Sequence, residues 1–258
     1  MLFVFFLTCV TAIDPTIVSL VVASKTENLT WLDTTLPAYQ RFIYHPNISY
    51  TGTRVNDNLM TQYDKAYEVC MYLRYIIDHY DNLNEYTIFM HAHESSWHSP
   101  KMVETIKRII PSQPFTNLNY NCFMTLNDKI GYFERIHANL SHLIGVKPDR
   151  INTYCCAQML IHRDLIRSHP LTYYVTLDQW IATTNEDSYL IALFFEYSWN
   201  FIFNQPNDMQ PLTNAFCSLV NCTSEELEDK TLNFQFYDWK GFHWQKSKPK
   251  RKPKFRHN

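Results

Sequence analysis

Short apolar runs, each ended by a polar cluster, recur along the chain. The runs at 16–24 and 86–90 are apolar or β-branched at most positions. That composition is typical of strands that are buried on both faces of a sheet. A run at 41–44 and a later one at 155–161 have the same character, so strands are predicted there as well.

Helical periodicity fills the segments between these runs. Apolar residues recur at three- and four-residue spacing over 61–80, which predicts the clearest helix. Ser99 and Pro100 are residue types favoured at the cap and first position of a helix, so another helix is predicted to begin there. Residues 112–128 show neither the periodicity of a helix nor that of a strand, and they are predicted to be irregular. A helix is predicted over 132–143, with Gly145 placed to end it. Further helices are predicted shortly after Asp164 and over 173–182 and 188–203.

The alternation of strands and helices predicts an α/β fold, a single domain with a Rossmann-like mixed sheet flanked by helices. The chain has 258 residues, 46% hydrophobic and 16% aromatic, which is enough for a sizeable core. Only four glycines occur, and none forms a G-x-G-x-x-G or P-loop pattern, which argues against a usual dinucleotide fold. The net charge of -2 argues against a general polyanion binder, so no nucleic-acid partner is predicted.

The two ends of the chain differ from the middle. Residues 1–12 are mostly apolar and finish in small residues, which predicts a signal peptide, although no basic residue precedes them. This run is shorter than the ~20 apolar residues of a membrane-spanning helix, so no transmembrane span is predicted. A buried first strand is the alternative interpretation. Residues 241–258 are basic and predicted to be disordered, which leaves 13–240 as the folded domain.

Sequons and cysteines agree with the secretory pathway as the localisation, either the endoplasmic reticulum and Golgi lumen or secretion. Six of the seven cysteines remain if Cys9 is removed with the signal, and an even number favours disulfides. Cys217 and Cys222 are the favoured local bridge. Cys155 and Cys156 are predicted to be buried or disulfide-bonded, because no activating pattern stands beside them. Four N-x-[S/T] sequons occur, at Asn28, Asn47, Asn139 and Asn221.

The polar cluster after the strand at 86–90 holds the strongest candidate chemistry. His91 and His93 are two residues apart, so on an extended chain they share a face. They could bind a divalent metal, with zinc favoured by imidazole ligands and manganese usual beside a diphosphate, and Glu94 could add a ligand. His98 is a candidate for proton transfer. Alternatively, these histidines only form hydrogen bonds in a polar pocket.

Four later residues are further candidates. Glu196 lies in a strongly apolar helical segment, where burial would raise its pKa and suit it to general-base work. The alternative is a buried carboxylate that pairs with Arg163. Arg163 is the candidate cation for a phosphate or carboxylate, unless it forms a local ion pair with Asp164. Trp97 and Trp199 could stack on a sugar ring, although tryptophans more often lie in the core.

Six segments, met in order along most of the chain, carry a resemblance to a known family. They are Val21-Val22-Ala23 with Glu27 and Leu29-Thr30-Trp31-Leu32, then Tyr72 to Leu83, Tyr86 to His98, Cys155-Cys156-Ala157-Gln158, His162-Arg163-Asp164 and Phe195-Glu196-Tyr197-Ser198-Trp199. Together they resemble the proteins called domain of unknown function 3431. That family has no settled activity.

The plan of this family looks like that of GT-A glycosyltransferases, which are nucleotide-sugar enzymes with a Rossmann-like sheet. The resemblance implies a substrate contact after the first strand, around Glu27 and Trp31. It also implies that the segment from His91 to His93 occupies the place of an acidic metal-binding triplet, and that Glu196 is a downstream acidic residue. Fold-level analogy of this kind is a weak basis for function.

The chain also departs from the family pattern. Ser24 and Thr26 stand where the family usually has Arg and Asn, and Ala66-Tyr67 replaces a usual Gly-Arg before Glu68. These changes remove two arginines, the side chains best suited to bidentate phosphate binding.

The leading hypothesis is a glycosyltransferase-like protein of the secretory pathway that moves a sugar from a nucleotide-sugar donor to a glycan or protein acceptor. In it, Glu196 deprotonates or positions the acceptor hydroxyl and Arg163 binds phosphate. A secreted, non-catalytic glycan- or protein-binding module is the alternative, favoured by the changes at Ser24 and Thr26. A metal-dependent hydrolase that uses the same histidines is a third hypothesis.

Overall fold

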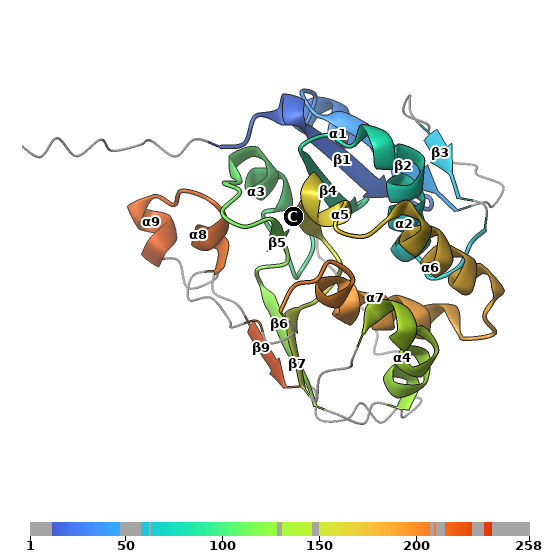
Figure 1. Ribbon diagram of the computed structural model, residues 1–258. Helices are drawn as coiled ribbons and strands as arrows, with labels where there is room; N and C mark the ends of the chain where they lie inside the picture. Colours follow the sequence, from blue (N-terminus) through green and yellow to red (C-terminus); the bar gives the residue numbers. More distant parts are fainter. Residues whose placement is uncertain are drawn as a thin grey trace, which may run out of the picture.

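Six strands form a mixed sheet through the middle of the molecule, in the order β3-β2-β1-β4-β8-β5 (Figure 1). Strand β1 pairs in parallel with both β2 and β4, whereas β8 is antiparallel to β4 and β5. In the strand order, the chain passes from β1 to β2 in one direction and from β4 toward β5 in the other, so a topological switch point lies between β1 and β4. The strands are β1 (Val18–Ala23), β2 (Gln40–His45), β3 (Asn58–Met60), β4 (Tyr86–His91), β5 (Phe115–Asn117) and β8 (Met159–His162).

The computed structural model describes residues 12–46, 58–61, 63–127, 131–145, 150–206, 209, 215–228 and 235–238. The predicted signal peptide except for its last residue, the sequon at Asn47 and the basic segment 241–258 lie outside the described residues. None of the helices in the described ranges is both long enough and apolar enough to cross a membrane.

Helices cover both faces of the sheet, as the nearly continuous apolar strands require. Val21 and Phe89 belong to the larger core, which contains residues of α2, α4, α6 and α7, while Leu20 and Val22 face a second core with α1 and α3. The 3-10 turns are Pro15–Ile17 and Tyr80–Asn82. The helices are α1 (Thr30–Thr35), α2 (Glu68–His79), α3 (Met102–Arg108), α4 (Gly131–Ile144), α5 (Arg163–Ile166), α6 (Leu171–Thr183), α7 (Ser188–Ile202), α8 (Ala215–Leu219) and α9 (Ser224–Glu228).

A second, three-stranded sheet lies beside the first, in the order β7-β6-β9. It is formed by β6 (Cys122–Asn127), β7 (Arg150–Tyr154) and β9 (Gln235–Asp238), with β6 antiparallel to β7 and parallel to β9. A third apolar cluster packs against it and includes Phe216 of α8. The predicted disulfide between Cys217 and Cys222 is confirmed at the end of α8.

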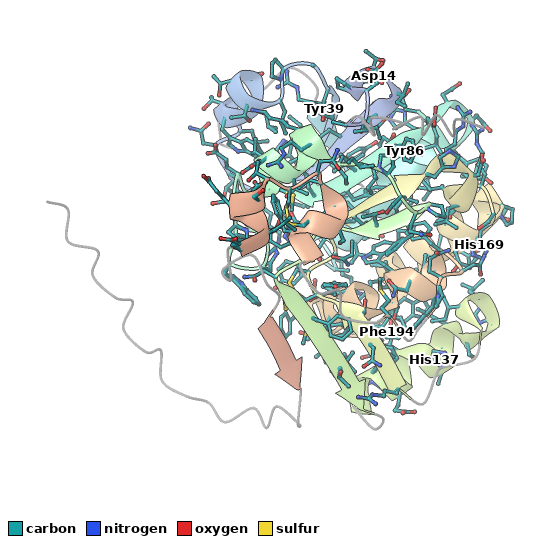
Figure 2. All side chains as sticks on the ribbon, turned by 90° about the vertical axis from the view of Figure 1, so that its left-hand side faces the viewer. Asp14, Tyr39, Tyr86, His137, His169 and Phe194 are labelled. Carbon is teal, nitrogen blue, oxygen red and sulfur yellow. A yellow bond between two sulfur atoms is a disulfide. The ribbon has the colours of Figure 1, made fainter. Side chains whose placement is uncertain are left out.

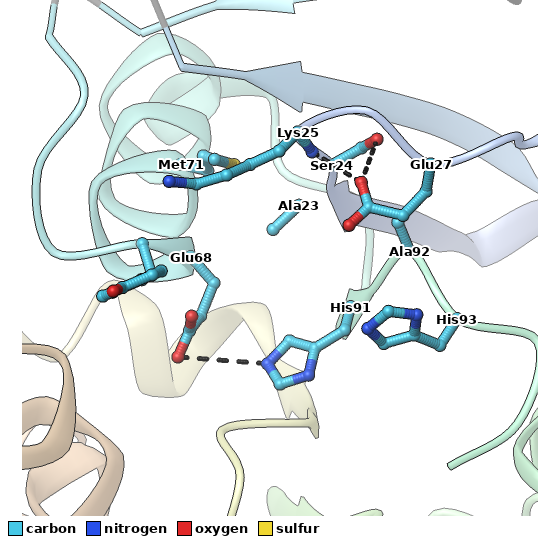
Figure 3. Close-up of a pocket in the computed structure, with 10 residues that line it drawn as sticks. Ala23, Ser24, Lys25, Glu27, Glu68, Met71, His91, Ala92 and His93 are labelled. Carbon is cyan, nitrogen blue, oxygen red and sulfur yellow. Dashed lines mark hydrogen bonds and ion pairs between the residues drawn. The ribbon is translucent and has the colours of Figure 1, made fainter. Parts of the chain in front are cut away.

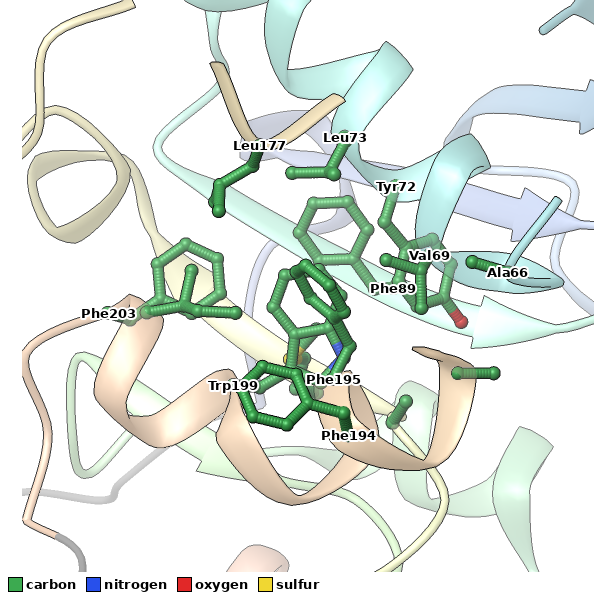
Figure 4. Packing of buried hydrophobic residues seen from close by; sticks show 14 of the residues in the cluster. Ala66, Val69, Tyr72, Leu73, Phe89, Leu177, Phe194, Phe195, Trp199 and Phe203 are labelled. Carbon is green, nitrogen blue, oxygen red and sulfur yellow. The ribbon is translucent and has the colours of Figure 1, made fainter. Parts of the chain in front are cut away.

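Aromatic side chains fill the larger core between α2 and α7 (Figure 4). The ring of Tyr72 lies 4.8 Å from that of Phe89 and 6.1 Å from that of Trp199. Trp199 is also stacked on Phe203 and only 2% exposed. Figure 2, which draws all described side chains, shows Phe194 of α7 among those packed in the molecule. Trp199 is therefore a core residue.

The predicted α/β class, a single domain with a mixed sheet flanked by helices, is confirmed, but several boundaries were wrong. Helix α2 begins at Glu68, not at residue 61, because Ala66 and Tyr67 have φ of 62° and 51°, outside the right-handed helical region. Helix α3 begins at Met102, because the Ser99 hydroxyl donates to Leu118 O, 3.1 Å away, and does not cap the helix.

Two further sequence predictions were wrong because short strands carry little periodic signal. The segment 112–128, predicted to be irregular, contains β5 and β6. The segment 155–161, predicted as one strand, is divided between a turn and β8. Cys155 and Cys156 form a disulfide in that turn, and Cys156 and Ala157 have φ of 73° and 47°. A strand cannot continue through two residues in the left-handed region.

Candidate functional site

Two adjoining hollows lie at the carboxyl ends of β1 and β4, with volumes of about 170 and 340 Å³. They share Tyr67, Glu68 and His91, and we call them together the cleft. The ends of the two strands are in register, with Ala23 beside His91. Open α/β sheets bind ligands in the crevice outside a switch point of this kind. The first hollow (Figure 3) is lined by Ala23, Ser24, Lys25, Glu27, Tyr67, Glu68, Met71, His91, Ala92 and His93, and the second adds Trp97, His98, Cys156, Tyr189, Ala192, Leu193 and Glu196.

The segment before α2 directs Glu68 into the cleft. Ala66 and Tyr67 are both in the positive-φ region, which costs L-residues about 1–2 kcal/mol each. The hydrogen bond between Ala66 N and Ser188 Oγ, 2.7 Å long, ties this turn to α7. Glycine, which the family resemblance implies at position 66, would adopt the same φ without the clash of a Cβ atom. Strained backbone often marks functional sites, and here it precedes a carboxyl group of the cleft.

Glu68 and His91 face each other across the cleft, with Glu68 Oε1 3.9 Å from His91 Nε2 (Figure 3). Burial raises the pKa of Glu68 to about 7, and burial followed by the nearby His93 lowers the pKa of His91 to about 4. The imidazole of His91 is therefore neutral at neutral pH. Its Nε2 is buried and has no hydrogen-bond partner among the described residues, so it is available to a bound group.

The metal ligands expected in this cluster are only partly together. The ring centroids of His91 and His93 are 6.3 Å apart, and both residues line the first hollow. Glu94 is exposed and is not part of either lining. Among the described residues, the three possible metal ligands that lie within 4.8 Å of one another are instead Cys122, Cys155 and Cys156. An ion beside His91 would have Glu68 within reach as a second ligand and would take further ligands from a substrate, as Mg²⁺ does at phosphate sites.

Glu196 of α7 supplies a third carboxyl group to the cleft, besides Glu27 and Glu68. The backbone N–H of Cys156, which the turn at Cys155–Cys156 directs toward α7, donates to Glu196 Oε1 over 2.7 Å. Burial raises the pKa of Glu196 to about 7, with a further contribution from Glu68, while the hydrogen bond from Cys156 opposes that rise. The carboxyl group can therefore both lose and accept a proton near neutral pH.

His98 is fixed at the rim between β4 and α3. Its Nδ1 lies 2.8 Å from Asn119 Oδ1 and 3.1 Å from Ser96 Oγ. Because Asn119 Oδ1 is an acceptor, the tautomer with the proton on Nδ1 fits this contact. Burial, and then the neighbouring His91, lowers the pKa of His98 to about 4, so this ring is also neutral at neutral pH.

Glu27 holds the loop that follows β1. Its Oε2 accepts hydrogen bonds from Ser24 Oγ, Lys25 N and Thr26 N, at 3.0, 2.6 and 3.0 Å. Burial acts to raise the pKa of Glu27, but these hydrogen bonds favour the charged form and leave the pKa below its usual value. Lys25 lies in the same wall of the cleft, with its Nζ 3.2 Å from Asp64 Oδ1.

A family model described as "Protein of unknown function (DUF3431)" matches residues 20–225, most of the chain. The chain belongs to the DUF3431 family. This membership confirms the resemblance found in the sequence segments. No curated protein matches the chain.

The remaining site predictions for this DUF3431 protein fall in different places. Trp97 is 61% exposed and lies in the wall of the second hollow, with its ring 5.3 Å from that of His98. Trp31 of α1 is half-buried against the second core and is not part of either lining. Trp199 is buried in the larger core. Arg163 lies at the opposite edge of the sheet, because β8 runs antiparallel to β4 and sets His162 beside Tyr86.

Several residues that line the cleft of the DUF3431 chain were not among the sequence candidates, including Lys25, Tyr67 and Glu68. Glu68 precedes the apolar stripe of α2, and its position beside a predicted family motif was the only signal in the sequence. Nothing in the local sequence of Lys25 or Tyr67 distinguishes them from ordinary surface residues. They reach the cleft because the turn before α2 folds against the loop after β1, with Lys25 Nζ 4.8 Å from the Tyr67 ring centroid.

Proposed function

We propose that the cleft is the active site of a glycosyltransferase-like enzyme of the secretory pathway, which moves a sugar from a nucleotide-sugar donor to a hydroxyl group of a glycan or protein. The observation that carries the proposal is Glu196, whose carboxyl group lies in the cleft wall with a pKa raised to about 7. A general base works best when its pKa is near the operating pH.

Glu196 would take the proton of the acceptor hydroxyl as that oxygen attacks the anomeric carbon of the donor sugar. Its Oε1 already accepts the N–H of Cys156, so Oε2 is the oxygen that would receive the proton. The bond from the anomeric carbon to the diphosphate breaks in the same reaction. Burial, with a smaller contribution from Glu68, raises the pKa of Glu196 and keeps the base only partly ionised before the acceptor binds.

The diphosphate leaving group would lie in the first hollow. Lys25 supplies a positive charge there, and the neutral His91 presents its free Nε2 beside Glu68. A carboxylate and an imidazole 3.9 Å apart, with phosphate oxygens to complete the shell, suit a divalent ion such as Mn²⁺ or Zn²⁺. Such an ion would neutralise charge on the leaving group. Trp97 at the rim offers an exposed aromatic face on which a sugar ring of the acceptor could stack.

A thermal-shift series with nucleotide-sugars, each with and without Mn²⁺ or Zn²⁺, tests donor binding. At about one hundred times the dissociation constant, a true donor should raise the melting temperature by roughly 5–10 °C. The same donors are then incubated with candidate acceptors, and release of the nucleoside diphosphate is measured. Glu196→Gln should still bind the donor but lose transfer. Glu225→Gln in α9, an exposed carboxylate outside the cleft, is the matched control and should behave as the wild type.

A non-catalytic glycan-binding module is the second candidate, and the cation content of the cleft favours it. Lys25 is the one lysine or arginine in the lining of the two hollows described here. A single positive charge is a weak binding site for a diphosphate. A shift with free oligosaccharides, and none with any donor in the presence or absence of metal, would support this module against the enzyme. Transfer of the sugar to water alone would instead identify a hydrolase.

A further inference from the structure

Three cysteine sulfurs meet behind the wall of the cleft. Cys155 and Cys156 are joined as a disulfide, and Cys122 at the start of β6 is a free, buried thiol. The three sulfur atoms all lie within 4.8 Å of one another. A free thiol so close to a disulfide is near enough to attack it by thiol–disulfide exchange after a local rotation of the side chains.

Strand register makes a second pairing available. Phe123 of β6 faces Tyr154 of β7 in an antiparallel pair, so the next residues, Cys122 and Cys155, also face each other. Cys155 N donates to Cys122 O over 3.1 Å, which continues the ladder by one step. Facing residues in such a pair have Cα atoms about 4.5–5.5 Å apart, within the range of about 4.4–6.8 Å that disulfides span. A Cys122–Cys155 bond therefore needs no large backbone movement.

The two pairings differ in where they leave the free thiol. Cys122 and Cys155 are each only 1% exposed, whereas Cys156 is half-buried and lines the second hollow of the cleft. Exchange would thus move the free thiol from the core to the cleft wall, next to Glu196, which accepts the N–H of Cys156.

We propose that the three cysteines interconvert between the pairings Cys155–Cys156 and Cys122–Cys155, and that the second pairing uncovers Cys156 as a cleft thiol that forms mixed disulfides with low-molecular-weight disulfides. The Cys122 thiolate attacks Cys155 Sγ, so that the Cys122–Cys155 bond forms as the Cys155–Cys156 bond breaks. The electron pair leaves on Cys156 Sγ, which takes up the proton lost by Cys122. No oxidant or reductant is consumed.

In the second step, the exchange of Cys156 with a small disulfide, one S–S bond again forms as another breaks. Cys156 Sγ, as the thiolate, attacks one sulfur of a small disulfide such as glutathione disulfide, and one molecule of glutathione leaves as the thiol. The rate of the first step is limited by the thiolate fraction of Cys122. Burial, together with the charge of Glu196, raises the pKa of Cys122 to about 12, so exchange is slow at neutral pH and faster in mild alkali.

The test uses the folded, unreduced full-length chain at mildly alkaline pH. It is incubated with glutathione disulfide or N-ethylmaleimide, quenched with acid and digested without reduction, and the peptides are identified by mass spectrometry. The proposal expects one cross-linked species, in which the Cys122 peptide is joined through Cys155 to the peptide that holds both Cys155 and Cys156, with glutathione or maleimide on Cys156. In Cys122→Ser, modification of Cys156 should fall at least about tenfold, because no internal thiol opens the disulfide.

Maleimide on Cys122 with the Cys155–Cys156 peptide intact would overturn the proposal, and so would absence of any modification at Cys156. If Cys122→Ser fails to fold, the peptide map of the wild type decides alone, because it reports both the modified residue and the cross-link. The map does not depend on transfer activity, so its outcome is separate from that of the proposed function.

Discussion

The two ends of β4 show how burial gives similar residues different chemistry. At its carboxyl end, His91 lies beside Glu68 in the cleft, and burial shifts the pKa values of both. At its start, Tyr86 pairs with His162 of β8, and the neighbouring Asp164 has a side chain that is 77% exposed. The side chains of His91 and His162 are similarly exposed, at 22% and 23%, but the carboxylate beside His91, Glu68, is only 16% exposed.

Strand direction causes this difference. The segments from His91 to Glu94 and from His162 to Asp164 both follow buried strands, and both were candidates for the same site. Strand β8 runs antiparallel to β4, so residues that follow β8 emerge at the edge where β4 begins. Titratable residues after a strand therefore belong to a common site only if the strands run the same way.

Glu196→Gln should produce the largest change at the cleft. The amide can still accept the N–H of Cys156 but cannot take a proton, so transfer should fall by about 10²–10⁴-fold. Turnover under saturating donor, with donor affinity from thermal shift, measures this effect. Unchanged turnover would remove Glu196 from the chemistry.

Trp199→Ala should give the largest change in stability. The ring is 2% exposed and packs against Tyr72 and Phe203, so its removal should lower the free energy of unfolding by about 3–5 kcal/mol. Urea denaturation followed by circular dichroism measures the loss. A wild-type midpoint would contradict the assignment of Trp199 to the core.

Replacing the two cleft carboxyls whose pKa values are raised, as Glu68→Gln with Glu196→Gln, should change how stability depends on pH. Their pKa values rise from 4.5 to about 7 on folding, so each lowers stability as pH increases from about 4.5 to about 7. The pKa values of His91 and His98 fall from 6.5 to about 4, so each raises stability as pH increases from about 4 to about 6.5. These effects offset each other in the wild type.

In the double variant the effect of the two raised carboxyls is absent, while that of the histidines remains. Relative to the wild type, it should gain about 1–3 kcal/mol per carboxyl at pH 8 and little at pH 4. Unfolding free energies from urea titrations at the two pH values measure the difference, with Glu225→Gln as the control. An equal difference at both pH values would contradict the raised pKa values.

Trp97→Ala should weaken acceptor binding without affecting stability. Loss of one stacking face is worth about 0.5–1.5 kcal/mol, which corresponds to roughly a two- to tenfold increase in the acceptor KM. The ring is 61% exposed, so the melting temperature should remain that of the wild type. A KM equal to that of the wild type would exclude Trp97 from the acceptor site.

Arg163→Ala should have the smallest effect. The side chain is exposed at the edge away from the cleft, so turnover should change by less than about twofold and stability by less than about 0.5 kcal/mol. Lys25→Ala is its counterpart within the cleft and should weaken donor binding. A strong loss of donor affinity in the Arg163 variant would show that the donor binds at the edge of the sheet that holds Arg163 and not in the cleft.

Local sequence was sufficient for the elements with long, regular patterns. The apolar runs predicted β1, β2 and β4, and the three- and four-residue spacing predicted most of α2, α4, α6 and α7. The local bridge between Cys217 and Cys222 followed from their spacing. The family resemblance, now supported by a match over residues 20–225, also came from local segments. Burial of apolar side chains dictates these patterns, so they are present in the chain before it folds.

Tertiary structure alone decided which polar residues share the cleft. The positive φ values at Ala66 and Tyr67 start α2 late and present Glu68, while the antiparallel direction of β8 removes Arg163 from the site. The disulfide of Cys155 with Cys156 divides a predicted strand and directs an N–H to Glu196. Polar groups gain altered pKa values from the neighbours that enclose them, and those neighbours come from segments far apart in the sequence.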